Sequence, residues 1–192
     1  TIDEDNETVK SSVRKRIPWL IILLFINLIT SGIVTGFEAT LTAIPTLALF
    51  MPLILNMAGN TGTQSLGVVI RLFASNQLAD SKDILKHLLR EFLTGIVNGL
   101  AVGAMLFALV FILKSIDGTP LSDALDFSKV IAISIAISLF ASTVAGTLIP
   151  ILMRMIKVDP AVASGPFITT VNDIIALLIY FGLANLMISS LL

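Results

Sequence analysis

Three amide side chains follow one another at helical spacing inside an apolar stretch, where they could hydrogen-bond a hydrated cation. They are Asn56, Asn60 and Gln64, within PLILNMAGNTGTQS. Residues four positions apart share one face of a helix, and Gly59 and Thr63 stand beside them. Polar groups are tolerated at membrane depth only where protein buries them or water reaches them. The stretch therefore predicts a polar path rather than a lipid-facing surface.

A single carboxylate stands in a second such stretch, VDPAVASGPFITTVND, where Thr169 precedes Asp173 by one helical turn. A helix starting near Pro166 carries Asp173 about 10 Å into the membrane at about 1.5 Å per residue. An Asp at a helix centre costs roughly 2.5 to 3.5 kcal/mol on insertion scales, so it should face water, bind a cation or be protonated. A protonated Asp173 bonded to a neighbouring amide such as Asn172 is the alternative to a cation site. No basic residue is expected inside another span to pair with it.

The donors near Asp173 are all hard oxygens, which suit Mg²⁺, Ca²⁺ or Mn²⁺ rather than copper or zinc. One carboxylate cannot balance a divalent ion, but a twofold homodimer presents the same residue from each chain. Mg²⁺ usually keeps several of its waters, so amides and threonines are useful partners for a hydrated ion. We therefore expect an ion path at or near a dimer axis.

The composition indicates an integral membrane protein, with 56% hydrophobic residues, 13% charged residues and a mean hydropathy of +0.99. The net charge of -1 does not favour a nucleic-acid partner. The absence of cysteine excludes disulfides, thiolate metal sites and cysteine nucleophiles.

Five segments are about as long as a membrane helix requires, so we predict an all-α fold with five transmembrane helices per subunit. The second segment contains Pro45, Pro52, Gly59 and Gly62, and is expected to be kinked or broken. Gly165 and Pro166 are expected to break the chain before the fifth, and the second and fifth spans should line the path. The expected spans are residues 18–36, 44–73, 87–114, 129–155 and 166–192.

Basic residues concentrate in cytoplasmic loops, and of the twelve Lys and Arg all but Lys114 and Lys129 fall on one side of these spans. This predicts a cell-membrane protein with a cytoplasmic N-terminus and an outer C-terminus. The acidic start TIDEDNE is no signal peptide, and we expect a linker at residues 1–17, a pore domain at residues 18–192 and further domains outside this segment.

Three local features are interpreted as structural rather than functional. Stripes of small residues at four-residue spacing predict helix packing rather than an aqueous lining; they are Gly95, Gly99 and Gly103 in the third span and Ser134, Ser138, Ser142 and Gly146 in the fourth. The segment ADSKDILKHLLREF predicts an amphipathic helix along the inner surface, with the only histidine, His87, solvated or interfacial. Trp19 and Tyr180 are either interfacial anchors or packing residues.

Both polar stretches resemble a known family. PLILNMAGNTGTQS resembles the signature of the MgtE magnesium transporter and channel family, and VDPAVASGPFITTVNDIIALLIYF resembles its last span. The first span adds RIPWLIILL and GFE, so the resemblance covers nearly the whole chain from about residue 14. It implies a homodimer with a Mg²⁺ path on its axis. It also implies cytosolic regulatory domains, one N-terminal and one pair of the cystathionine-β-synthase type, which sense intracellular Mg²⁺ and close the pore through a connecting helix.

The resemblance also assigns the metal-site residues. Asp173 is the principal acid, Gly59 and Thr169 lie at the ion through backbone oxygens, and Asn60 and Thr63 line it. Asp159 matches a position that helps bind Mg²⁺ near the gate, although from the sequence alone it would more often be a loop or helix-capping residue. The chain departs from the family pattern at Ala58, where Gly is common, and at Thr63, where Asn is common.

Other functions remain open at this point. A secondary transporter could use Asp173 to carry a proton or Na⁺. An intramembrane enzyme is not expected, because aspartyl chemistry needs two acids and His87 is predicted at the surface. Whether ions move passively, and how Mg²⁺ ranks against Mn²⁺, Ca²⁺ and Co²⁺, is not encoded in any pattern found here.

Overall fold

The structure is a computed structural model that describes residues 8–78, 80–157 and 165–188 of the 192-residue chain. Within these ranges the elements are helices and no strand occurs, as the predicted all-α fold requires. In chain order the helices are α1 (Val9–Gly36), α2 (Glu38–Ala43), α3 (Pro45–Ala74), α4 (Ser81–Ile116), α5 (Leu121–Met155) and α6 (Gly165–Ile188).

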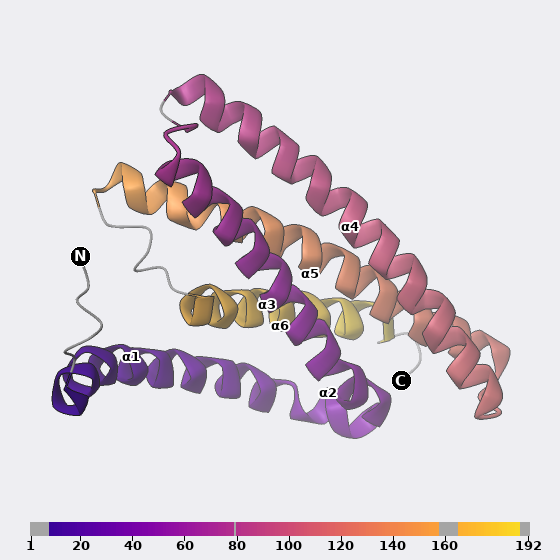
Figure 1. Cartoon of the computed structure of the whole chain (residues 1–192). Helices are drawn as coiled ribbons and strands as arrows, with labels where there is room; N and C mark the ends of the chain where they lie inside the picture. Colours follow the sequence, from indigo (N-terminus) through magenta and orange to yellow (C-terminus); the bar gives the residue numbers. More distant parts are fainter. Residues whose placement is uncertain (1–7, 79, 158–164, 189–192) are drawn as a thin grey trace.

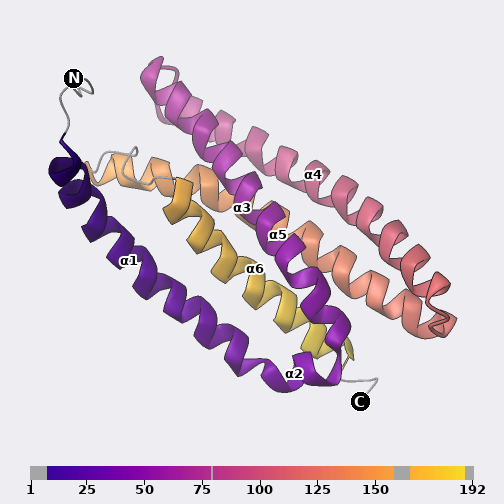
Figure 2. The same ribbon diagram turned by 60° about the horizontal axis from the view of Figure 1, so that its bottom comes forward.

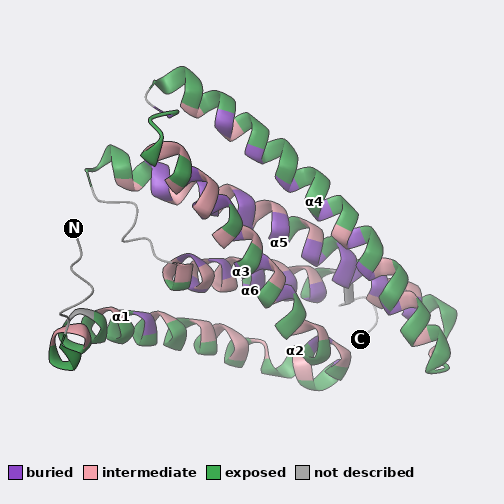
Figure 3. Ribbon diagram, viewed as in Figure 1, coloured by how far each residue is buried: buried purple, intermediate pink, exposed green. Residues whose placement is uncertain are grey.

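Helices α3, α5 and α6 contact one another and form the centre of the bundle. Helix α4 packs along α5 at one edge, and α1 packs on α6 at the opposite edge. Figures 1 and 2 show this order from two directions, with the short α2 turning the chain from α1 into α3. Buried residues are concentrated on the central helices, whereas α1 is largely exposed (Figure 3).

Four helices, α1, α4, α5 and α6, are long and apolar enough to cross a membrane. Helix α3 is not among them, although its 30 residues extend about 45 Å at about 1.5 Å per residue. The amides and small residues of α3 lower its hydropathy while its length remains sufficient. The predicted helix positions are thus confirmed, and the fifth crossing stays a prediction.

Helix α3 was expected to be kinked or broken; the break is wrong, and the kink stays a prediction. It continues through Pro52 and both glycines to Ala74. A proline removes one backbone N–H from the helical ladder but need not end a helix that is held by its neighbours. Helix α6 is likewise continuous from Gly165, with Pro166 in the first turn, where its missing N–H is harmless.

The expected surface helix at residues 79–92 is also corrected, because α4 runs without interruption from Ser81 to Ile116. At 36 residues and about 1.5 Å per residue it measures about 54 Å, longer than a bilayer core of about 30 Å. His87 lies on its buried face rather than in solvent. Helix α1 similarly joins residues 9–17 of the expected linker to the first span.

The small-residue stripes pack helices together, as predicted. A Cβ atom on Gly99 would lie 2.5 Å from the carbonyl oxygen of Ala136, and one on Gly103 would lie 3.0 Å from that of Ala132. The serines of the α5 stripe, Ser134, Ser138 and Ser142, are fully buried, which supports packing rather than an aqueous lining.

Of the two aromatic residues considered as interfacial anchors or packing residues, Tyr180 packs inside the bundle, whereas Trp19 is partly exposed and can still be an anchor. Tyr180 is fully buried and its hydroxyl donates to the carbonyl oxygen of Leu47 at 2.9 Å, tying α6 to α3. The ring of Trp19 lies 5.8 Å from that of Phe167, which joins α1 to α6.

Candidate ion site

Helices α3 and α6 approach each other closely where the two polar stretches meet. A Cβ atom on Gly59 would lie 2.8 Å from Cγ2 of Thr169, and one on Gly165 would lie 3.8 Å from Cγ2 of Thr63. Because the later residue of α3 meets the earlier residue of α6, the two helices run antiparallel. Two separate segments of the chain, predicted independently, are thus brought into contact.

The amide row of α3 is an exposed face of the protomer. Asn56, Asn60 and Gln64 are all exposed, and Nδ2 of Asn60 donates to Oδ1 of Asn56 at 3.2 Å. The hydroxyl of Thr63 donates to the carbonyl oxygen of Asn60 at 2.9 Å. The predicted common face exists, and its amides retain donors and acceptors for further partners.

Asp173 is half-buried on α6, one turn after Thr169, which itself touches Gly59. Within the described ranges, the ion pairs found are Arg90–Glu91, Lys114–Asp117 and Lys129–Asp126, and none includes Asp173. The described residues also contain no group of three or more His, Cys, Asp or Glu able to hold a metal. The described part of the chain thus has one carboxylate, Asp173, on α6, which packs against α3, and its role as an ion ligand stays a prediction.

Asn172 fills the space over Gly62 and is fully buried. On its other side Gly62 meets Gly146 of α5, so three helices converge there through two glycines and one amide. Neither Nδ2 nor Oδ1 of Asn172 has a hydrogen-bond partner among the described residues. The alternative in which Asn172 binds a protonated Asp173 is therefore wrong.

A model of the MgtE family, described as a divalent cation transporter, matches residues 51–183, which include both polar stretches. The chain belongs to the MgtE family. It is 49% identical over 177 residues to the magnesium transporter MgtE of Bacillus subtilis, covering 92% of this chain and 37% of that protein. The protein of the same name from Enterococcus faecalis is 37% identical over 185 residues, covering 96% of this chain and 39% of that protein.

A third relative, the magnesium transporter MgtE of Thermus thermophilus, is 35% identical over 175 residues, covering 91% of this chain and 37% of that protein. The chain thus spans less than two fifths of the length of these three relatives. The predicted family membership is confirmed.

The residues that the MgtE resemblance assigned have different surroundings. Gly59 is buried, Thr169 and Thr63 are half-buried, and Asn60 is exposed. Gly59 and Thr169 lie inside continuous helices, so their carbonyl oxygens normally accept backbone N–H bonds and have one lone pair left for an ion's water. The hydroxyl of Thr169 already donates to the carbonyl oxygen of Gly165 at 2.9 Å. Asp159 lies outside the described residues.

The two departures from the MgtE pattern fit the helix. Ala58 is fully buried within α3, which continues through it. Thr63 uses its hydroxyl within its own helix rather than extending an amide toward the open face.

Sequence reasoning missed a second buried acid, Glu91 of α4. It accepts a hydrogen bond from Oγ of Ser65 at 3.2 Å and lies 3.9 Å from the guanidinium of Arg90. The expected spans therefore contain a second acid besides Asp173, and this acid, Glu91, is buried. The available signal was the four-residue spacing of His87 and Glu91, which places both on one face of α4.

Proposed function

We propose that this chain is the membrane pore region of a Mg²⁺ channel or transporter. The observation that carries the proposal is the contact of α3 with α6, which sets an exposed row of amides beside a half-buried, unpaired carboxylate. Membership of the MgtE family supports the ion class, since its description is that of divalent cation transporters. The three relatives are each named as magnesium transporters.

In this proposal α3 is the fifth transmembrane helix, and two protomers meet so that their α3 and α6 faces line a path on the twofold axis. The exposed amides then face water rather than lipid, which removes the cost of placing them at membrane depth. The two copies of Asp173 together balance one divalent cation. Gly59 and Thr169 contribute backbone oxygens, while Asn60 and Thr63 bind the waters of a largely hydrated ion.

We also propose that Asp159 binds Mg²⁺ at the cytoplasmic mouth, that the N-terminus is cytoplasmic, and that the C-terminus is outside the plasma membrane. The basic residues of α1, of the end of α3 and the start of α4, and of the end of α5 support this orientation. Since the chain covers under two fifths of its relatives, regulatory domains outside this segment are part of the proposal.

The test is Mg²⁺ flux into vesicles containing the full-length protein and its Asp173→Ala variant. Loss of an ion contact of about 1.4 kcal/mol lowers flux about tenfold, so we expect at least that reduction while the dimer still assembles. Asp117→Ala, which removes an exposed carboxylate at the end of α4, is the matched control and should leave flux unchanged.

The same vesicles separate this proposal from its alternative. Unchanged Mg²⁺ flux in Asp173→Ala would reject the proposed ion site. Flux of another solute that follows a proton or Na⁺ gradient without divalent ions would instead favour coupled secondary transport. Parallel measurements with Mn²⁺ and Ca²⁺ establish the order of selectivity.

A further inference from the structure

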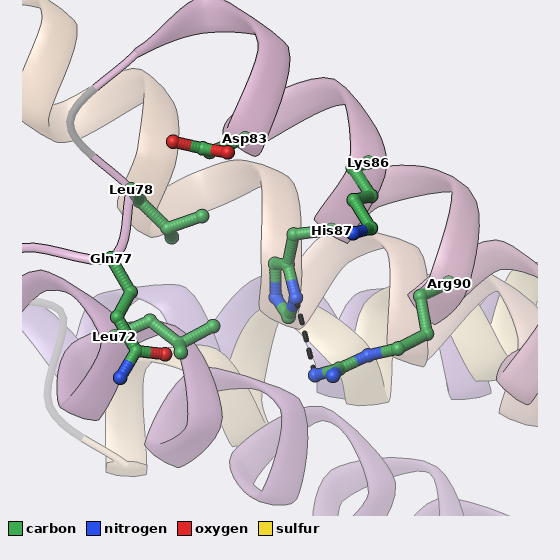
Figure 4. A pocket seen from close by; sticks show the side chains of 7 residues that line it. All are labelled: Leu72, Gln77, Leu78, Asp83, Lys86, His87 and Arg90. Atoms are coloured by element: carbon green, nitrogen blue, oxygen red, sulfur yellow. Dashed lines mark hydrogen bonds between the residues drawn. The ribbon is translucent and has the colours of Figure 1, made fainter.

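A cavity of about 380 Å³ lies where α3 ends and α4 begins, and no residue of the candidate ion site lines it (Figure 4). Leu72, Gln77 and Leu78 form the wall contributed by α3 and the following turn. The facing wall comes from the first turns of α4. The cavity is therefore half apolar and half charged, at one end of the helix bundle.

The charges on the α4 wall are unevenly placed. Lys86, His87 and Arg90 gather on one side of the cavity, whereas Asp83 lies toward its other end (Figure 4). With a neutral imidazole, the two cations and one carboxylate leave a single net positive charge. This balance favours a monoanion over a dianion or a metal cation.

The contact between Arg90 and His87 determines which ring nitrogen of His87 carries the proton. Nη2 of Arg90 lies 3.4 Å from Nδ1 of His87. A guanidinium can only donate hydrogen bonds, so Nδ1 must accept, and the proton of the neutral ring is then on Nε2. His87 is 5% exposed, and its Nε2 has no partner among the described residues. His87, a residue of the cavity wall, thus carries an enclosed donor that has no acceptor among the described residues.

Arg90 keeps capacity for a further ligand. Its side chain is 64% exposed, and its contacts with His87 and with Glu91 both use the same nitrogen, Nη2. A guanidinium has five N–H donors in a planar fork that matches the oxygens of a phosphate group. Lys86 adds an exposed ammonium beside it.

We propose that this cavity binds a phosphate oxyanion, of the kind carried by the phosphodiester of a membrane phospholipid. Lys86 and Arg90 supply the charge, and Nε2–H of His87 donates to a phosphate oxygen. Leu72 and Leu78 contact the glycerol carbons, and Asp83 accepts from a headgroup hydroxyl. Basic pockets between membrane helices bind anionic headgroups in this way.

Two exposed leucines on α4 support the lipid as the source of the phosphate. Leu85 and Leu89 are 58% and 59% exposed, and they alternate along the helix with the basic residues of the cavity. Free phosphate offers the same oxygens but has no apolar part that could contact leucine side chains. This inference does not depend on Mg²⁺ transport.

The experiment is native mass spectrometry of the full-length protein in detergent with three separate probes. They are dioctanoyl phosphatidylglycerol, dioctanoylglycerol with the same chains and no phosphate, and inorganic phosphate. We expect saturable binding of the phospholipid and none of dioctanoylglycerol. Displacement of the lipid by an equal concentration of inorganic phosphate would keep the site and identify free phosphate as its ligand.

The decisive variant combines Lys86→Gln with Arg90→Gln, both of which are exposed and should leave the fold intact. Each basic group near the surface strengthens anionic-lipid binding, so the double change should weaken it about tenfold. The matched control combines Arg71→Gln with Lys82→Gln, at the same end of the bundle but outside the cavity, and should change binding less than about twofold. His87→Phe, which keeps a ring but removes the donor, should weaken binding by about threefold.

Equal loss in the two double variants would overturn the proposal, because it would indicate general attraction to a basic surface. Binding of dioctanoylglycerol as tight as that of the phospholipid would overturn it as well, since acyl contact alone would then explain retention.

Discussion

The interface of α3 with α6 and the interface of α4 with α5 share a sequence pattern but differ in character. Both place glycines at helical spacing, and both bring two helices into close contact. Between α4 and α5, Gly99 and Gly103 meet backbone carbonyl groups of α5, so the two helix backbones approach closely at these positions. Between α3 and α6, Gly59 meets the side chain of Thr169, and the adjoining face of α3 remains exposed and polar. Glycines three or four residues apart thus allow close approach, whereas the residues flanking them determine whether an aqueous path can adjoin the contact.

Half-buried Asp173 and buried Glu91 provide the strongest test of this difference between the two interfaces. Asp173→Asn keeps the shape of the side chain but removes a charge from the open α3–α6 edge, so Mg²⁺ flux should fall at least about tenfold. Glu91→Gln makes the same change where Ser65 already satisfies the carboxylate, and should alter flux less than about twofold. Flux assays in vesicles on both variants measure this, and equal effects would show that the two regions do not differ in function.

The close contact of α4 with α5 can be tested separately by Gly99→Ala. The new methyl group would press on the carbonyl oxygen of Ala136, which is backbone and cannot rotate away, so α4 and α5 must separate. Overpacking of this kind costs about 1 to 3 kcal/mol. Thermal unfolding in detergent measures the loss.

The control is Gly67→Ala on α3, where nothing lies within 4 Å and the higher helix propensity of Ala should leave stability equal or slightly higher. If Gly99→Ala unfolds at the same temperature as Gly67→Ala, the close contact does not hold α4 to α5.

Tyr180→Phe tests the hydrogen bond that joins α6 to α3 at the other end of their contact. It removes only the hydroxyl that donates to the carbonyl oxygen of Leu47, and the ring keeps its tilted contact with Phe181. The loss should destabilise the protein by about 0.5 to 1.5 kcal/mol. Denaturant unfolding measures this, with flux as the second readout; unchanged stability would mean that the apolar contacts of α6 alone fix its position.

The smallest effect is expected from Asn60→Ala on the exposed amide row. It removes the donor to Oδ1 of Asn56 and one group that binds the waters of a passing ion. Because neighbouring amides can partly replace it, we expect Mg²⁺ flux to fall about threefold. Asn76→Ala, in the turn after α3, is a control amide outside the row and should be neutral for flux; a loss as large as that for Asp173→Asn would make Asn60 an essential ligand.

Much of the fold followed from the sequence pattern. The positions of the long helices follow from the lengths of the apolar segments, and the small-residue stripes and the shared face of Asn56, Asn60 and Gln64 follow from a helical repeat. The breaks predicted at Gly59 and Gly62 were wrong because the low helix propensity of glycine is a weak effect compared with tertiary packing. Both glycines are held in α3 by contacts with α5 and α6, which the sequence does not list as neighbours.

The sequence alone determined that the chain is apolar, helical and a member of its family. It also predicted that Asp173 and the amide row of α3 do not face lipid. Only the tertiary structure decided which side chains are enclosed. Asn172 and Asp173 are adjacent in sequence, yet the first is fully buried over Gly62 and the second is half-open. Consecutive residues of a helix point about 100° apart, so the rotation of α6 against α3 and α5 sets their environments. That rotation is fixed by contacts between distant segments, here Gly62, Gly146 and Tyr180, rather than by any local pattern.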